Sequence, residues 1–425
     1  MRVALVMISL AGALRFAADS PTTDFAALYK AATAAHAAKD YTAEEARLHQ
    51  ALALRPNHPG ALYQLAAAQA RSGKADAALD TLATLAAMGL AYDPAADSDF
   101  DGLHRSPRFT QINTEFFHDR EPAGEAQQVF RLVNPQFIPE GLAFDEDTKA
   151  YFIGGVHDRR IFRVGRSGEP QEFVGPSSVW APLGMQVDTT RHVLWVVTAG
   201  IPEMVNAKDE ELGRSAVVGF DLASGKQKAR FVLPDDKSPH QLNDLTVASD
   251  GTIYTTDARG GILYALDGST GKYTALTKPG ELLSAQGVAL SADRKRLYVA
   301  DYSRGLYVYD LEQHALSRMD VADRICVYGV DGLYRYENQL VAVQNGIRPN
   351  RVVRLALDPA GRRVVHATVL AANLPDFDEP TLGVMVGNRF NFVANSQWNH
   401  FDLKHQLPPS SELRPPEVMR VTVPD

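Results

Sequence analysis

Four residues with oxygen-bearing side chains occupy the same place in a phrase that recurs through the second half of the chain. Each stands directly before a position that is usually glycine, and they are Glu140, Asn243, Gln286 and Asp331. Two carboxylates and two amides brought together are costly to desolvate unless they share a partner. A hard divalent cation is the simplest one, Ca²⁺ first and then Mg²⁺ or Mn²⁺, because no His or Cys holds these positions. Zn²⁺ suits this donor set less well.

The phrase predicts a strand, a turn and a second strand. Its six copies are IPEGLAFDEDTKAYFIGG, APLGMQVDTTRHVLWVVT, QLNDLTVASDGTIYTTDA, SAQGVALSADRKRLYVAD, GVDGLYRYENQLVAVQNG and PTLGVMVGNRFNFVANS. Their glycine positions, with Asp244 in the third copy, are 43 to 60 residues apart, which suits four-stranded blades. We therefore predict an all-β six-bladed propeller over residues 130–425.

The first strand of each blade lines the channel of a propeller, so the residues before the glycine position should converge at one end of it. Leu183 and Leu382 hold this place in the other two copies, so the position does not require polarity. The alternative to a ligand site is that channel mouths are wet and tolerate any polar residue. We favour the ligand site because the polar residues are carboxylates and amides.

A second ring of residues follows from the antiparallel geometry, since the second strand returns to the same rim about 14 residues later. It contains Gly155, Thr198, Asp257, Asp301, Asn345 and Asn395. Asp257, Asp301 and Asn345 neighbour the polar blades and are predicted to contact substrate or orient water. The alternative is that they cap strand ends through Asx hydrogen bonds.

Asp331 is the preferred general base of this predicted site, and two histidines in predicted rim loops are alternatives. They are His240, near the third blade, and His157, near the first, which is also a candidate substrate contact. The alternative for each is an ordinary surface residue. The sequence has no G-x-S-x-G or Walker A motif, so it gives no support to a nucleophile-elbow serine hydrolase or a P-loop NTPase.

The composition excludes several other classes. Lys and Arg number 43 against 51 Asp and Glu, and no long basic run occurs, so a nucleic-acid partner is not expected. Hydrophobic residues make up 45% of the 425-residue chain and charged residues 22%, as in globular proteins. The single cysteine, Cys326, excludes an intrachain disulfide and a Cys-cluster zinc site, and is expected to be a buried small hydrophobe.

Residues 1–18 have the outline of a signal peptide, with Arg2, an apolar run over 3–14 and small residues at 17 and 18. This predicts a periplasmic or secreted protein. A cytoplasmic location is the alternative, because Arg15 lies near the cleavage region and no A-x-A precedes Asp19. The run is too short to span a bilayer and no later stretch is long enough, so no membrane span is predicted.

Residues 21–120 form a predicted helical domain and linker. Alanine dominates residues 23–88, and two segments, KDYTAEEARLHQALALRPN and GKADAALDTLATLAAMG, align at a spacing of 34 residues. This resembles the tetratricopeptide repeat, although two units are fewer than the usual three. The helices are predicted either to dock a protein partner or to pack as an appendage. The whole chain is thus an α+β multidomain protein, with tetratricopeptide-like helical repeats before the propeller.

Four of the phrases, PEGLAF, LNDLTVASDGTIYTTD, SAQGVALSADRKRLYVAD and GVDGLYRYENQLVAV, resemble the senescence marker protein, gluconolactonase and luciferin-regenerating enzyme family over residues 130–405. Paraoxonase and strictosidine synthase propellers look similar at greater distance. The resemblance implies a divalent metal, often calcium, on Glu140 and Asp331, with Asn243 nearby contacting the metal or the substrate. Gln286 stands where the family has an asparagine, and Gln241 where many sugar lactonases have an arginine.

The resemblance implies metal-assisted hydrolysis of a lactone or related ester. The cation would be held by Glu140, Asn243, Gln286 and Asp331. The alternative is a non-catalytic periplasmic ligand-binding or scaffold protein, which the Gln286 substitution and the attached helices favour. Retention of Glu140, Asn243 and Asp331 favours the enzyme.

Overall fold

The computed structural model describes residues 24–424, so the predicted signal peptide lies outside the described residues. The chain divides into two compact units. One is helical, runs to residue 120 and includes residues 323–326; the other holds residues 121–322 and 327–425. Among the described residues, no helix has the length and apolar character needed to cross a membrane.

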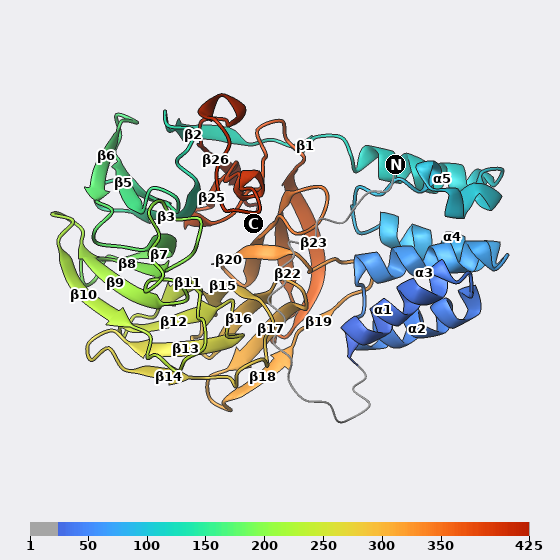
Figure 1. The fold of residues 1–425 in the computed structure, drawn as a ribbon, viewed down its shortest axis with the longest axis horizontal. Coiled ribbons are helices and arrows are strands. Elements are labelled where there is room, and N and C mark those ends of the chain that lie inside the picture. The colour runs from blue at the N-terminus through green and yellow to red at the C-terminus, as the bar shows by residue number, and fades with distance from the viewer. Residues whose placement is uncertain (1–23, 425) are drawn as a thin grey trace. The chain divides into compact units, whose positions relative to one another are not determined.

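The helical unit is built from two helix pairs and a further helix (Figure 1). The pairs are α1 (Phe25–Ala37) with α2 (Tyr41–Leu54), and α3 (Pro59–Arg71) with α4 (Ala75–Ala86). Short 3₁₀ turns η1 (Pro94–Ala96) and η2 (Ser98–Leu103) lead to α5 (Pro107–His118). Asp24 and Asp40 cap the first two helices through their carboxylates, and Pro59 stands at the start of the third.

The second pair of helices begins 34 residues after the first, so the predicted repeat spacing is present in the structure. Small buried residues such as Ala32 and Ala51 let the helices approach closely, and Leu48 and Leu65 fill the space between them. The assignment of these pairs to the tetratricopeptide class stays a prediction.

The second unit is a six-bladed propeller, as predicted, and Figure 1 shows its blades following one another from green to orange-red. The first blade contains β3 (Pro139–Asp145), β4 (Ala150–Gly155), β5 (Arg160–Val164) and β6 (Pro170–Val174). The second contains β7 (Ala181–Asp188), β8 (Val193–Ala199), β9 (Ser215–Asp221) and β10 (Gln227–Val232). The third contains β11 (Leu242–Val247), β12 (Thr252–Asp257), β13 (Ile262–Asp267) and β14 (Tyr273–Ala275).

The last three blades differ from one another in how they are completed. The fourth contains β15 (Ala285–Leu290), β16 (Arg296–Asp301), β17 (Gly305–Asp310) and β18 (Ala315–Arg318). The fifth contains β20 (Val330–Tyr336), β21 (Gln339–Gln344), β22 (Arg351–Leu357) and β23 (Arg363–Ala372), extended by β1 (Ala123–Gly124) and β19 (Asp320–Val321). The sixth contains β24 (Gly383–Val386), β25 (Arg389–Val393), β26 (Glu417–Thr422) and β2 (Gln127–Arg131).

The ring of blades is closed by strands from both ends of this unit. The outer strand of the sixth blade, β2, precedes the first blade in sequence and pairs with β26. The innermost strands contact one another in order, and β24 returns to β3. Each innermost strand is the edge strand of its own sheet, and closure of the ring covers these short edges with the neighbouring blades.

In the first five blades, a β-bulge interrupts the innermost strand where the recurring phrase has its glycine position. A bulge re-aims the side chains around it. In the first blade glycine is needed there because the next blade approaches closely: a Cβ on Gly141 would lie 1.9 Å from the carbonyl oxygen of Leu183. In the first five blades, the residue before the glycine position is therefore held by a repeated backbone irregularity.

Candidate functional site

Glu140 and Asp331 are buried carboxylates on the innermost strands β3 and β20, with side chains 4% and 7% exposed. Glu140 Oε2 accepts a hydrogen bond of 2.6 Å from Trp398 Nε1, and Asp331 Oδ2 accepts one of 2.7 Å from Asn345 Nδ2. Among residues 24–424, no Lys, Arg or His forms an ion pair with either carboxylate. Both negative charges are thus buried without a cationic partner.

Burial without a cationic partner raises the pKa of both carboxyl groups. Desolvation and the negative charge of Asp331 raise the pKa of Glu140 well above its usual range, although the Trp398 hydrogen bond opposes this shift. Desolvation raises the pKa of Asp331 to about 6, against the opposing hydrogen bond from Asn345. Carboxylates with raised pKa values in a polar channel are typical of ligand and catalytic sites.

The predicted amide residues lie on or beside the same innermost strands. Asn243, on β11, is buried, and its Nδ2 has no hydrogen-bond partner in the described part of the chain. Asn345 also donates to the carbonyl oxygen of Pro380, but its buried Oδ1 has no partner there. Gln286, on β15, is half-buried and donates from Nε2 to Ser284 Oγ at 3.1 Å. Unpartnered amide atoms are consistent with a site that binds something else.

Glu379 is an acidic residue near this site that the sequence analysis missed. Its backbone has a φ of 61°, in the left-handed region that non-glycine residues rarely adopt, and its Oε2 accepts a 2.8 Å hydrogen bond from the Asn399 N–H. Desolvation, followed by the charges of Asp331 and Asp378, raises its pKa to about 7. Its charge in turn raises the pKa of Glu140, so it adds to the uncompensated negative charge.

The chemistry of this donor set fits a hard divalent cation. The set offers buried carboxylates and the amide oxygens of Asn243 and Asn345, of which Asn345 Oδ1 is buried without a partner, and no Lys, Arg or His of the described residues pairs with the carboxylates. Among the described residues, no three His, Cys, Asp or Glu side chains are grouped closely enough to hold a metal ion. A cation here would therefore depend on amide oxygens as well as on Glu140 and Asp331.

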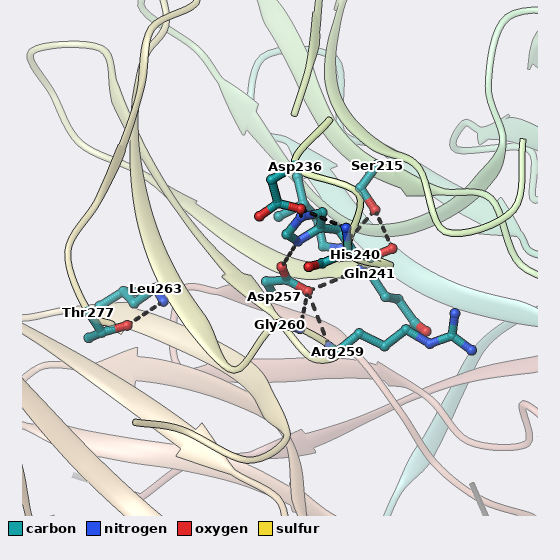
Figure 2. A network of polar contacts seen from close by, with 11 residues as sticks. Ser215, Asp236, His240, Gln241, Asp257, Arg259, Gly260, Leu263 and Thr277 are labelled. Atoms are coloured by element: carbon teal, nitrogen blue, oxygen red, sulfur yellow. Dashed lines mark hydrogen bonds and ion pairs between the residues drawn. The ribbon is translucent and has the colours of Figure 1, made fainter. Parts of the chain in front are cut away.

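His240 and Asp257 form a different network, which Figure 2 shows. His240 Nδ1 lies 2.6 Å from Asp257 Oδ2, and Nε2 lies 3.0 Å from Asp236 Oδ1. The hydrogen bond to Asp257 is the largest cause that raises the pKa of His240, to about 9. A protonated imidazole with both nitrogens donating has no lone pair for a proton, so this geometry does not suit His240 to the predicted role of general base.

Two predicted members of the second ring serve as caps. Asp257 Oδ1 accepts hydrogen bonds from the N–H groups of Gln241, Arg259 and Gly260 (Figure 2). Asp301 accepts from the N–H groups of Ser303, Arg304 and Leu283. This is the capping alternative that the sequence left open, whereas Asn345 bonds directly to Asp331.

His157 follows β4 and faces an aromatic group near Glu140. Its Nδ1 donates to the carbonyl oxygen of Glu203 at 2.6 Å, and its ring lies 5.9 Å from that of Phe401. A separate cavity of about 380 Å³, lined by Tyr151, Arg389 and Arg420 among others, contains none of the predicted site residues. The predicted carboxylate and amide residues therefore lie at the bulges of the innermost strands and not in that cavity.

A family model described as the SMP-30/Gluconolactonase/LRE-like region matches residues 138–334. The chain therefore carries an SMP-30/gluconolactonase/LRE-like region. The predicted family resemblance is confirmed. The matched residues include Glu140, Asn243, Gln286 and Asp331, and they end before Asn345, Glu379 and Trp398.

Three solved structures are among those similar to this chain. A gluconolactonase from Xanthomonas campestris is 16% identical, with a TM-score of 0.47, over 72% of this chain and 99% of that one. Regucalcin from Agrobacterium tumefaciens, described as calcium-binding, is 14% identical, with a TM-score of 0.49, over 71% and 97%. A luciferin-regenerating enzyme is 16% identical, with a TM-score of 0.47, over 71% and 95%. No curated protein matches the chain.

Proposed function

We propose that the propeller is a metal-dependent hydrolase of a lactone or a related ester. The observation that carries this proposal is the pair of buried carboxylates, Glu140 and Asp331, without a cationic partner among the described residues. Both lie at bulges of the SMP-30/gluconolactonase/LRE-like region. The family assignment supports the reaction class, and the donor set supports the cation.

Glu140, Asn243 and Asp331 are the residues that would hold the cation, with Gln286 as a further amide donor. Ca²⁺ is the first candidate, because all of these donors are oxygens. A cation bound there would polarise the ester carbonyl and stabilise the negative charge that develops on its oxygen.

Asp331 is the proposed general base. Its Oδ2 is oriented by Asn345, and its pKa of about 6 leaves it ionised at neutral pH. It would take the proton from the water that attacks the ester carbon and return it to the departing alkoxide oxygen. Glu379, with a pKa of about 7, is the second carboxylate near this position and would hold or relay that proton.

Metal content and lactone turnover of the purified protein test the proposal. The panel should contain γ- and δ-lactones and aryl esters, assayed before and after chelation and after Ca²⁺, Mg²⁺ or Mn²⁺ is restored. We expect hydrolysis that chelation abolishes and cation restores. Absence of turnover across the panel, with each cation present, would overturn the proposal.

One observation favours a ligand-binding protein as the second candidate. Trp398 already occupies Oε2 of Glu140, which leaves one oxygen of that carboxylate for a cation. Cation-dependent binding of a lactone analogue without turnover would support this alternative.

A further inference from the structure

An aromatic group lies beside Glu140 and takes no part in the proposed chemistry. Trp398 opens the 3₁₀ turn η3 (Trp398–His400), and its indole nitrogen donates to Glu140 at 2.6 Å. The ring of Phe401 lies 6.1 Å from that of Trp398, and the ring of His157 lies 5.9 Å from that of Phe401. We call these three side chains the aromatic wall.

The aromatic wall is backed by apolar core and is only partly buried. Trp398 and Phe401 pack against a cluster that includes Ile201 and Met204, which are 4% and 3% exposed. Trp398, Phe401 and His157 each keep part of their surface accessible. Trp398 connects this group of rings to the proposed site through its hydrogen bond to Glu140.

The segment that carries Trp398 and Phe401 is fixed at several points. Ser396 Oγ donates to the carbonyl oxygen of Pro139, which directly precedes Glu140. Gln397, with a φ of 64°, bonds to both the N–H and the carbonyl oxygen of Arg414. The N–H of Asn399 donates to Glu379. A wall fixed before the ligand arrives loses little freedom on binding.

We infer that the substrate carries an apolar alkyl or aryl group on the acyl or lactone ring, and that the aromatic wall binds this group. The inference rests on the proposed function, because it places the ester at Glu140 and Asp331. Phe401 has no polar atom in its side chain, and Trp398 Nε1 and His157 Nδ1 are engaged by Glu140 and by the carbonyl oxygen of Glu203. His157 Nε2 is then the one polar atom of the aromatic wall for which no hydrogen bond to a described residue is found, so the ring faces offer contact surface to an apolar group but few partners to the hydroxyl groups of a sugar.

Two lactams, which resist hydrolysis, provide the test: a five-membered lactam with a pentyl chain and the same lactam without it. Affinities are measured by calorimetry with Ca²⁺ present, and by tryptophan fluorescence. Of the three tryptophans, Trp180 and Trp195 are buried, so Trp398 is the accessible reporter. We expect the pentyl lactam to bind about tenfold more tightly or better, from burial of its methylene groups.

The variants separate the aromatic wall from the rest of the site. Phe401→Ala keeps the Trp398 hydrogen bond to Glu140 and should reduce the preference to about threefold or less. Trp398→Phe should keep most of the preference, because an aromatic ring remains. Leu403→Ala is the matched control: it lies in the same segment with a side chain that is fully exposed, and both affinities should stay unchanged.

The outcomes distinguish this inference from the proposed function. Preference for the pentyl lactam without turnover of any lactone supports the aromatic wall and overturns the hydrolase. Turnover of lactones without preference for the alkyl chain, or with preference for a sugar lactone, overturns the aromatic wall and leaves the hydrolase standing. Absence of lactam binding overturns the inference.

Discussion

Two clusters of acidic side chains lie in the propeller, one around His240, where Asp257 is buried and Asp236 is exposed, and one around the buried Asp331. In the first, the imidazole of His240, whose pKa is raised, lies between Asp257 and Asp236. Main-chain N–H groups donate hydrogen bonds to the other carboxylate oxygen of Asp257 (Figure 2). In the second, Glu140 and Asp331 receive hydrogen bonds from Trp398 and Asn345 but no positive charge from the described residues.

Because only the His240 cluster contains its own cation, we expect that cluster to have a structural role and the Asp331 cluster a functional one. A carboxylate that pairs with a cation of its own chain stabilises the fold and has no need of a ligand. Burial of negative charge without such a cation lowers stability unless a proton or a metal ion binds. On the proposed function, the Asp331 cluster would bind its ligand at a cost in stability, whereas the His240 cluster stabilises loops of the third blade.

The largest expected effect is on turnover. Asp331→Asn removes the proposed base and one carboxylate donor but keeps the size of the side chain, and should lower kcat/KM for lactones by about 1,000-fold. Steady-state rates with saturating Ca²⁺ measure this. The matched substitution in the other cluster, Asp257→Asn, should cost less than about tenfold. Equal losses in the two variants would erase the distinction between the clusters.

The second expected effect is on unfolding. Asp257→Asn leaves the His240 charge without its closer partner and should lower the free energy of unfolding by about 3 kcal/mol. Urea denaturation, followed by circular dichroism in chelator, measures this change. Asp331→Asn should leave the free energy of unfolding unchanged or raise it under the same conditions, because it removes an uncompensated charge. A larger loss from Asp331→Asn than from Asp257→Asn would contradict the comparison.

The third expected effect is a fall in stability as pH rises in the absence of metal. The pKa values of Asp331, near 6, and of Glu379 and Asp244, both near 7, are above those of the unfolded chain. The folded protein therefore holds protons that the unfolded chain releases, and it loses this stabilisation between about pH 4 and 7. The free energy of unfolding in urea with chelator should be lower at pH 7.5 than at pH 5 by at least about 2 kcal/mol, and the fall should be smaller in Asp331→Asn. Stability that rises over this interval would contradict the pKa assignments.

The smallest expected effect comes from His240. A raised histidine pKa stabilises the fold fully below the unfolded value and loses that effect as pH rises through about 9. Wild-type protein should lose about 1 kcal/mol more than His240→Gln between pH 7 and 10. Parallel pH profiles for the two proteins would show that the imidazole is not held in its charged form.

Much of the propeller was predictable because its information is local and repeated. Each phrase has its own strand, turn and strand, so six copies predict six blades without knowledge of their contacts. The same repetition identifies Glu140, Asn243, Gln286 and Asp331. The closing strand β2 carries no copy of the phrase, and its partner β26 becomes its neighbour only when the ring closes.

The rest of the site depends on contacts that no repeat records. Glu379 and Trp398 lie outside the strands of the sixth blade, and both come near Glu140 only when the ring closes: Trp398 donates a hydrogen bond to it, and the charge of Glu379 raises its pKa. One signal was present: an acidic pair at 378 and 379 directly precedes Pro380 and the sixth phrase. A polar residue at a strand end can cap a turn or face the channel, and the sequence does not distinguish the two cases. Only the structure shows that Asp257 and Asp301 cap turns, whereas Asn345 bonds to Asp331.

Calorimetric titration of Ca²⁺ into chelator-treated protein shows whether the Asp331 cluster binds a cation. We expect one cation per chain at neutral pH, with release of the proton that its raised pKa allows Glu140 to hold. Glu140→Gln and Asp331→Asn should each weaken binding by about tenfold or more, and Asp257→Asn should not. Absence of binding by Ca²⁺, Mg²⁺ or Mn²⁺, or equal affinity in wild type and Glu140→Gln, would contradict this expectation.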